Sequence, residues 1–271
     1  MPADAPHPPT DPGRPRAADP KRSASYVGHH LDPAKGLQYD ERYATDRWLE
    51  YVSAREAEVL GHLCHTLFGE RPLRVLDFAC GTGRILSMLE DRAASAIGVD
   101  VSEPMLAEAR RKLKRSHLVQ ANLIDEPVLA GERFDLITAF RFFVNAEPSL
   151  RADALRALRP LLAPDGYLVF NDHHNPRSIR WGYTRLATAI RHQQPEVNYL
   201  PVGECIRLAE SGGFEVVSIH SVGLLHLPKL KVHPGLCRLC DRIAGHFRPL
   251  SAVSEAPIFV CRAKTVGGKD H

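Results

Sequence analysis

The sequence predicts an α/β protein with a mostly parallel seven-stranded sheet and helices on both of its faces. Apolar runs of strand length alternate with stretches of helical periodicity from about residue 70 onward, which is typical of right-handed crossovers between parallel strands. The run Val75–Phe78 ends in a loop of small residues that contains Gly81 and Gly83, and a helix begins directly after it. A second apolar run, 96–99, ends in the acidic residue Asp100.

Each expected strand is a short run that is rich in β-branched or aromatic residues. The seven strands are expected at 73–78, 95–100, 117–120, 134–140, 166–170, 214–222 and 258–263. Helices are expected at 39–68, 83–92, 103–114 and 201–211. A further helix is expected between the fourth and fifth strands, where leucines fall at positions 150, 155, 158, 161 and 162.

Composition limits the class of protein. The chain has 271 residues, of which 44% are hydrophobic, enough for one good core. Its 35 basic and 32 acidic residues nearly balance, so no dominant polyanionic partner is expected. The six cysteines show no small disulfide framework, which favours reduced thiols in the cytoplasm. No apolar run approaches the ~20 residues of a membrane span, and the N-terminus lacks the apolar core of a signal peptide.

The loop after the first strand has a specific pattern. A dinucleotide-binding loop would carry a third glycine at position 86, which is leucine in this chain. The loop and Asp100 together resemble the class I S-adenosylmethionine (SAM) dependent methyltransferases, whose first motif reads roughly Val-Leu-Asp-x-Gly-x-Gly-x-Gly. Asp77, Gly81 and Gly83 match this motif, and Ala79 stands in place of its first glycine. A generic strand–helix turn of another α/β protein is the alternative, and the order and spacing of the two motifs argue against it.

The resemblance covers about 70–264 and implies a Rossmann-like sheet with an antiparallel last strand. It also implies an N-terminal helical lid at 36–69 and a methyltransferase domain at 70–265, in which the insertion 173–200 shapes the acceptor pocket. Residues 1–35 are rich in proline and charge and are expected to be a disordered tail, and 266–271 to be a short C-terminal tail.

SAM is the cofactor that the resemblance implies, bound beyond the carboxyl ends of the strands. An acid at the tip of the second strand can accept hydrogen bonds from both hydroxyls of a ribose, which assigns Asp100. Gly81 and Gly83 would let the cofactor approach bare backbone, and the helix start would favour its carboxylate. Arg84 could assist that carboxylate, with a solvated arginine at a helix start as the alternative.

Two segments are expected against the adenine. Val101 and Met105 could pack on its face, although core packing is an equal alternative for Met105. The family usually has an aspartate after the third strand that accepts from the adenine amino group, and Gln120–Leu123 occupies that place here. Asn122 can accept the same hydrogen bond, and Asp125 is the alternative.

The acceptor side is expected after the fourth and fifth strands. Phe140, followed by Arg141 and Phe142, would cover the sulfonium end of the cofactor, because aromatic faces attract cations; core packing is the alternative for Phe140. Asp172 and His173 are candidates for positioning or deprotonating the acceptor. A polar loop without a catalytic role is the alternative, since in-line methyl transfer mainly requires positioning.

One further pattern in the sequence concerns metal binding. His233, Cys237, Cys240 and His246 are spaced so that they could hold zinc. Apolar residues of the same stretch also fall on one helical stripe, and four-ligand zinc sites usually show tighter paired loops. We therefore expect a helix without a metal.

The expected function is methyl transfer from SAM to an oxygen or nitrogen of a small-molecule acceptor. A nucleic-acid or protein methyltransferase and a non-catalytic SAM-binding protein are the alternatives. Amino-directed nucleic-acid enzymes of this class show an Asp/Asn-Pro-Pro-Tyr/Phe motif after the fourth strand, where this chain has Phe140–Phe143. This difference and the balanced charge argue against a nucleic-acid partner. The sequence names neither the acceptor nor an oligomeric state.

Overall fold

The structure is a computed structural model that describes residues 41, 43, 45–189, 200–226, 232–245 and 247–264. The predicted N-terminal tail, the first residues of the predicted lid, residues 190–199 of the predicted insertion and the predicted C-terminal tail lie outside these residues. In the described part, no helix is both long and apolar enough to cross a membrane.

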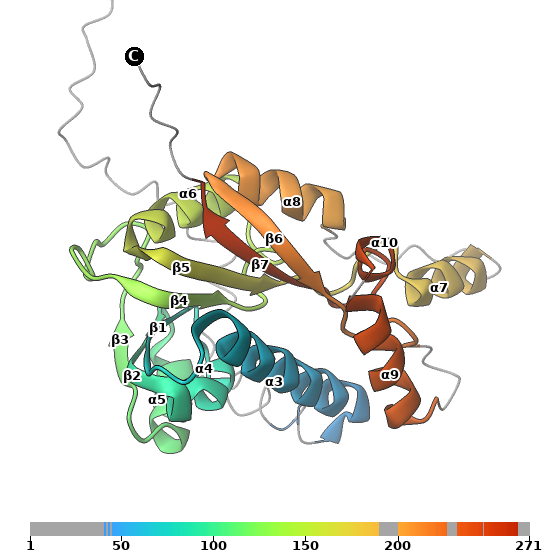
Figure 1. The fold of residues 1–271 in the computed structure, drawn as a ribbon, viewed down its shortest axis with the longest axis horizontal. Coiled ribbons are helices and arrows are strands. Elements are labelled where there is room, and N and C mark those ends of the chain that lie inside the picture. The colour runs from blue at the N-terminus through green and yellow to red at the C-terminus, as the bar shows by residue number, and fades with distance from the viewer. Residues whose placement is uncertain are drawn as a thin grey trace, which may run out of the picture.

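A seven-stranded sheet forms the centre of the fold, in the order β3-β2-β1-β4-β5-β7-β6 (Figure 1). The first five strands pair in parallel, and β7 lies between β5 and β6, antiparallel to both. The predicted fold class is therefore confirmed. The strands are β1 Leu73–Phe78, β2 Ala93–Asp100, β3 His117–Gln120, β4 Phe134–Ala139, β5 Leu162–Asn171, β6 Phe214–His220 and β7 Ile258–Ala263.

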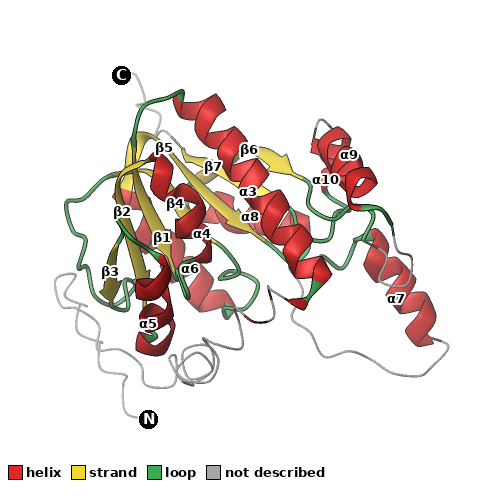
Figure 2. Cartoon of the chain, turned by 90° about the horizontal axis from the view of Figure 1, so that it is seen from below, coloured by secondary structure: helices red, strands yellow, loops and turns green. Residues whose placement is uncertain are grey.

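Helices cover both faces of this sheet (Figures 1 and 2). On one face lie α3 Arg47–Phe68, α4 Arg84–Leu89 and α5 Glu103–Lys112, and on the other α6 Pro148–Leu158 and α8 Val202–Ser211. At one end of the molecule, away from the edge strand β3, lie α7 Ile179–Ala189, α9 Pro234–Gly245 and α10 Arg248–Ser251. Single 3₁₀ turns follow α4 (Glu90–Arg92) and α6 (Arg159–Leu161).

The predicted helix before β5 is too long. The helix α6 ends at Leu158, and the stretch Arg159–Leu161 forms a 3₁₀ turn that contains Pro160. A proline cannot donate the N–H that would continue an α-helix, and it disfavours helical backbone in the residue before it. Leu162, which we expected in this helix, is instead the first residue of β5 and pairs with Phe134 of β4.

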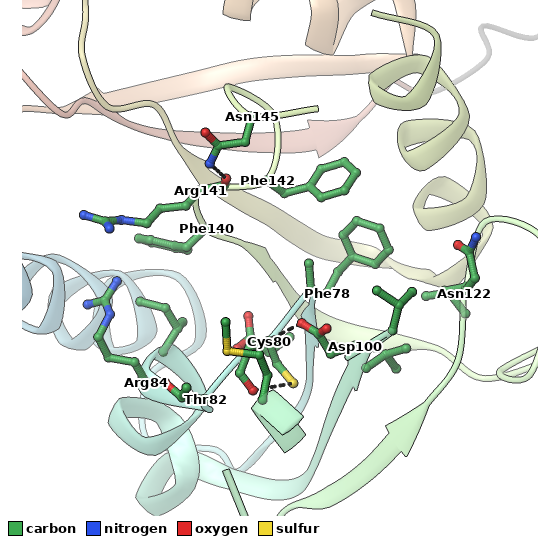
Figure 3. A pocket seen from close by; sticks show the side chains of 18 of the residues that line it. Phe78, Cys80, Thr82, Arg84, Asp100, Asn122, Phe140, Arg141, Phe142 and Asn145 are labelled. Carbon is green, nitrogen blue, oxygen red and sulfur yellow. Dashed lines mark hydrogen bonds between the residues drawn. The ribbon is translucent and has the colours of Figure 1, made fainter. Parts of the chain in front are cut away.

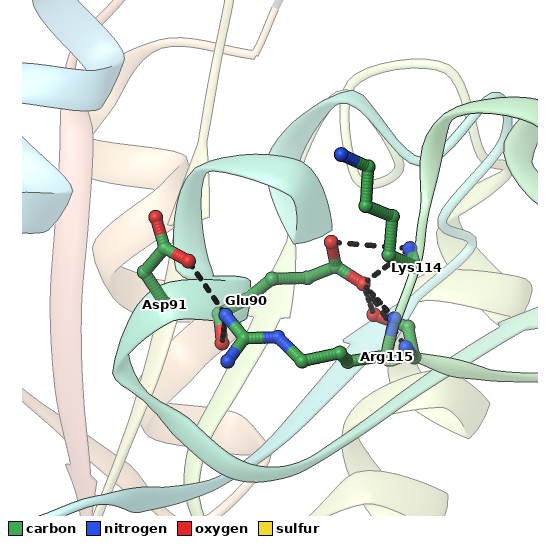
Figure 4. Close-up of polar contacts among 5 residues, drawn as sticks. Glu90, Asp91, Lys114 and Arg115 are labelled. Atoms are coloured by element: carbon green, nitrogen blue, oxygen red, sulfur yellow. Dashed lines mark hydrogen bonds and ion pairs between the residues drawn. The ribbon is translucent and has the colours of Figure 1, made fainter.

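The turn between α5 and β3 is held by the carboxylate of Glu90 (Figure 4). It accepts hydrogen bonds from the backbone N–H groups of Lys114, Arg115 and Ser116 and from the Ser116 hydroxyl, at 2.7–3.1 Å. Burial alone would raise the pKa of this carboxyl, but these hydrogen bonds outweigh it and hold the pKa below its usual value. The contact fixes the start of β3, and with it the position of Asn122 beyond the end of that strand.

The glycine turn after β1 depends on close packing against α5. Gly83 has a left-handed backbone, with φ 74°, and caps the start of α4. A Cβ at this position would lie 2.7 Å from Leu113 Cδ1 and 3.2 Å from Ala109 Cβ. Gly83 therefore allows the turn and α5 to approach each other, and the motif glycine at this position has a packing role.

We expect Gly83→Ala to destabilise the fold by about 2 kcal/mol, because the methyl group overpacks the contact with α5 and strains a left-handed residue. The free energy of unfolding in urea measures this loss. Gly131→Ala is the control, since Gly131 also has a positive φ, 88°, but no atom lies within 4 Å of an added Cβ. Equal losses in the two variants would contradict the packing role.

Candidate active site

A cavity opens beyond the carboxyl ends of β1, β2 and β4, where the strand order reverses (Figure 3). All but two of the predicted site residues line it: Asp77, Ala79, Gly81, Arg84, Asp100, Val101, Met105, Asn122, Leu123, Phe140 and His173. Gly83 and Asp172 are the two that do not. Gly83 packs on α5 instead, and Asp172 is buried outside the cavity.

The Asp100 carboxylate is fixed by two backbone groups. Its Oδ2 accepts a hydrogen bond from the Gly81 N–H at 2.8 Å, and its Oδ1 accepts one from the Ser102 N–H at 2.9 Å. These contacts join the loop after β1 to the loop after β2. The carboxylate is 9% exposed and lines the cavity, so it has one orientation there before any ligand binds.

The loop after β1 turns through residues with left-handed backbone. Ala79 has φ 55° and Gly81 has φ 54°. Alanine tolerates this region at a cost of about 1–2 kcal/mol, so the substitution in the motif keeps the turn that glycine usually provides. An added Cβ on Gly81 would meet no atom within 4 Å, so the space over this residue is open.

Asp77 is buried under the same loop. Its Oδ1 accepts a hydrogen bond from the Thr138 hydroxyl at 2.6 Å, whereas its Oδ2 is buried without a hydrogen-bond partner. Burial raises the pKa of this carboxyl to about 7, although the Thr138 hydrogen bond opposes the shift. Asp77 therefore lines the cavity as an acid that a cationic or N–H-bearing ligand would stabilise in its charged form.

Arg84 is neither solvated nor free to follow a ligand. Its Nη1 lies 2.5 Å from Oε2 of Glu56, a fully buried residue of α3, and 3.3 Å from the Ser53 hydroxyl. The other oxygen of Glu56 accepts a hydrogen bond from the Asn171 amide at 2.9 Å. Asn171 Oδ1 in turn accepts from the Arg141 N–H at 2.7 Å. A buried chain of polar contacts thus joins α3 to α4, to the end of β5 and to the loop after β4.

Tyr43 lies between the two arginines of the cavity wall. Arg84 Cζ is 4.5 Å from the centre of the Tyr43 ring, and Arg141 Cζ is 5.0 Å from it. Both distances suit cation–π contacts. An aromatic residue from the N-terminal segment therefore contacts the cavity wall on the side of α3.

Only one of the two candidate residues after β3 lines the cavity. Asn122 lines the cavity, whereas Asp125 does not. Asp125 Oδ2 accepts a hydrogen bond from the Asn122 amide at 2.7 Å, and Asn122 Oδ1 accepts a long one from the Ile124 N–H at 3.3 Å. Asp125 orients the Asn122 side chain at the cavity edge.

The remaining cavity wall is mainly apolar. Arg141 and Phe142, predicted beside Phe140, line the cavity. Its residues outside the prediction are Phe78, Cys80, Thr82, Ile85, Val99, Ala121, Ile124, Asn145 and Leu150. The Phe78 and Phe142 rings meet edge to face, with centres 4.8 Å apart (Figure 3). Phe140 lines the cavity and also packs in the core. Most of these residues adjoin a motif, but no sequence signal marked Asn145 or Leu150.

His173 and Asp172 have opposite surroundings. His173 lines the cavity, and its buried Nδ1 has no hydrogen-bond partner. Burial, with the nearby Arg141 and His174, holds the pKa of the His173 imidazole well below its usual value, so the ring is neutral at pH 7. Asp172 is buried outside the cavity, and burial raises its pKa to about 8. Of the two predicted catalytic residues, the cavity contains only the histidine.

The histidines and cysteines with zinc-like spacing belong to α9 and the residues beside it. Cys237 and Cys240 lie on this helix, and His246 lies outside the described residues. Across the residues that the structure describes, no three His, Cys, Asp or Glu side chains gather in a group that could hold a metal ion.

Comparisons with known proteins find a methyltransferase domain in part of the chain. Residues 75–166 match the methyltransferase domain family. The chain is 40% identical over 97 residues to malonyl-[acyl-carrier protein] O-methyltransferase of Enterobacter lignolyticus, covering 36% of this chain and 38% of that protein. It is 40% identical over 120 residues to demethylmenaquinone methyltransferase of Thermus thermophilus, covering 41% and 52%. A SAM-dependent methyltransferase structure from Thermotoga maritima superposes with TM-score 0.60 at 17% identity, covering 87% and 99%.

The match over residues 75–166 and the methyltransferase relatives support the class that the glycine loop and the acid after β2 predicted, the class I SAM-dependent methyltransferases. The matched segments cover only 38% and 52% of the length of these two curated relatives. The likeness to the solved structure is one of fold.

SAM is the cofactor of this class, and the cavity fits it. Gly81 leaves open space above bare backbone, and Asp100 presents a carboxylate of fixed orientation. Asp77 adds a buried oxygen that lacks a donor. A cationic ligand with amino and hydroxyl groups would fill the open space and donate hydrogen bonds to these carboxyl oxygens.

Gly81→Ala is expected to weaken SAM binding by about tenfold or more, or ~1.4 kcal/mol, because the added methyl group occupies the open space over the loop. Titration calorimetry with SAM measures the change. Gly131→Ala adds a methyl group to another positive-φ glycine with open space, far from the cavity in the sequence, and should bind SAM as the wild type does. Equal affinities in the two variants would contradict the fit.

Asp172 predicts a dependence of stability on pH. Its folded-state pKa of about 8 lies above the usual 3.8, so the folded state keeps a proton that the unfolded chain loses. The free energy of unfolding should therefore fall as pH rises from about 4 to 8, by at most ~1.4 kcal/mol per pH unit from this group. Asp172→Asn should remove this part of the slope and stabilise the protein at pH 8 relative to the wild type. Urea unfolding at several pH values tests this, and an unchanged slope would contradict it.

Proposed function

We propose that the protein transfers a methyl group from SAM to an oxygen or nitrogen of a small-molecule acceptor. The observation that supports this most is that one cavity combines the fixed Asp100 carboxylate at one wall with the neutral His173 ring at another. SAM supplies an electrophilic methyl group on a sulfonium that is a good leaving group. The protein then has to bind the cofactor, orient the acceptor and exclude water.

In this proposal the loops after β1, β2 and β3 hold the cofactor. Asp100 accepts hydrogen bonds from the ribose hydroxyls, and the backbone of Ala79 and Gly81 faces the ribose and methionine portion. Val101, Met105 and Leu123 flank the adenine, and the Asn122 amide, oriented by Asp125, accepts from its amino group. Arg84 keeps its role toward the methionine carboxylate while Glu56 fixes its position.

The acceptor side is proposed between the loops after β4 and β5. Phe140 and Phe142 offer apolar and aromatic surface near the reacting centre, and Arg141 forms part of the wall beside His173. The neutral imidazole of His173 can accept the proton of a hydroxyl acceptor as its oxygen attacks the methyl group, or the proton of the ammonium that forms when a neutral amine is methylated. We do not propose Asp172 as a proton acceptor, because its carboxyl is buried outside the cavity and holds a proton at neutral pH.

The curated relatives support a small acceptor group. One is named for malonyl-[acyl-carrier protein] and the other for demethylmenaquinone, and each name specifies methylation of a small chemical moiety. The described cavity, bounded by the apolar and aromatic residues after β4, suits a substrate of that kind.

The test is formation of S-adenosylhomocysteine from SAM across a panel of hydroxyl- and amine-bearing metabolites. We expect turnover with at least one acceptor, and His173→Gln to lower kcat by roughly 100-fold or more, because the proton acceptor is lost. SAM affinity, measured by calorimetry, should stay close to that of the wild type.

His174→Gln is the control for the acceptor side. His174 is the next residue but points outward, is 45% exposed and lies 3.5 Å from Glu255. It should leave kcat within about threefold of the wild type, since proton transfer does not need it. SAM binding without turnover on any acceptor would contradict the proposed function, and equal kcat values for the two variants would contradict the role of His173.

A further inference from the structure

A buried carboxylate fixes which side of helix α9 faces the protein interior. Asp241 is fully buried and accepts hydrogen bonds from the Tyr51 hydroxyl at 2.6 Å and the Ser221 hydroxyl at 2.8 Å. It also accepts from the backbone N–H groups of Gly223 and Leu224, at 2.7 and 2.8 Å. Because Asp241 must face inward to keep these four bonds, the opposite face of α9 must face outward.

That outward face is apolar. Leu236, Leu239 and Ile243 of α9, followed by Phe247 and by Leu250 of α10, recur at spacings of three and four residues. Each of these side chains is between 40% and 58% exposed. Single exposed apolar residues are ordinary on protein surfaces, but three on one face of α9, followed by two more in the next seven residues, mark an interaction surface.

Helix α7 contributes further exposed apolar side chains. It lies at the same end of the molecule as α9 and α10 (Figures 1 and 2). The Ile179 N–H at its start donates to the Val253 carbonyl at 3.4 Å, which joins α7 to the segment that follows α10. Ile179 and Tyr183 are also exposed large side chains. We call the exposed apolar residues of α7, α9 and α10, with the intervening Phe247, the apolar end face.

The three helices of the apolar end face carry mainly positive charge. Helices α7, α9 and α10 contain five arginines, of which Arg180 pairs with Glu255, and their only acidic residue is the buried Asp241. Arg238 and Arg242 flank the stripe, with side chains 44% and 65% exposed. Both lie 3.6 Å from Glu58 of α3, which also pairs with Arg55, so a single carboxylate serves three guanidinium groups. Because the whole chain is nearly neutral, this excess is local.

We propose that the apolar end face docks on the surface of an anionic lipid bilayer. An amphipathic helix with large apolar side chains on one face and arginines beside them lies in the headgroup region of such a bilayer, where the arginines contact lipid phosphates. The face gathers apolar and basic residues without an exposed acid among the described residues of its three helices, which matches this partner. The proposal rests on the surface alone and does not depend on the identity of the acceptor.

The position of the face relates it to the cavity. Because β6 is antiparallel to β7, which is antiparallel to β5, β6 runs in the same direction as β5. Helix α9 follows β6, and α7 follows β5. Both helices therefore lie near the carboxyl ends of these strands, on the side of the sheet where the cavity opens. Docking would therefore turn the carboxyl ends of these strands toward the bilayer.

The test is co-sedimentation of the full chain with vesicles of phosphatidylcholine alone, or of phosphatidylcholine mixed with phosphatidylglycerol. We expect binding to the anionic vesicles that weakens with salt. Leu239→Ser combined with Phe247→Ser should lower this binding by at least about tenfold, because it removes inserted apolar surface. Arg238→Gln combined with Arg242→Gln should lower it by about tenfold and reduce its salt dependence.

Val128→Ser is the matched control, because Val128 is 47% exposed but lies outside the three helices, and it should bind vesicles as the wild type does. SAM titration and thermal melting show that each variant is folded, which separates this test from that of the proposed function. Absence of sedimentation with anionic vesicles, or equal binding to both vesicle types, would overturn the proposal. A dimer that Leu239→Ser and Phe247→Ser convert to a monomer would overturn it too, since the face would then join two copies.

Discussion

The buried carboxylate of Glu56 is the contact on which the cavity wall depends. A charge without partners in the interior costs several kcal/mol, so Glu56 is stable there only with the Arg84 guanidinium and the Asn171 amide in contact with it. These two partners fix α3 against the start of α4 and the end of β5. Asn171 then holds the N–H of Arg141, a non-glycine residue with φ 61°. One side chain of α3 thus sets the position of three segments that line the cavity.

The parts of the site that could be predicted from the sequence are those that local chemistry determines. A strand with Asp77 near its end, a loop whose backbone must be left-handed and an acid at the tip of β2 each follow from a few adjacent residues. The rule that ligands bind beyond the carboxyl ends of parallel strands then brings the segments together. The predicted helix before β5 is too long because the leucine spacing continues through Pro160, whereas the observed helix ends at Leu158, just before the turn that contains this proline.

The parts that could not be predicted depend on side-chain direction and on long-range contacts. Asp172 and His173 are adjacent, and neighbours in extended backbone point to opposite sides, so only the structure shows which one lines the cavity. The choice between Asn122 and Asp125 likewise required the turn that lets Asp125 bind the Asn122 amide. Glu56 did leave a signal in the sequence, because it falls on the apolar stripe of α3 between Val52 and Val59. An acid in such a position indicates a buried partner elsewhere in the chain.

Helix α3 also connects the cavity to the apolar end face. Glu56 holds the cavity wall on one side of this helix, while Tyr51 and Glu58, at other positions around it, contact Asp241 and the two arginines of α9. The Asp241 contacts are short and buried, so α9 cannot rotate about its axis without losing hydrogen bonds from α3 and from the loop after β6. The outward orientation of the apolar stripe is thus enforced by the same helix that orients Arg84. The end face and the cavity therefore form one rigid arrangement around α3, in which neither can be reoriented without disturbing contacts of the other.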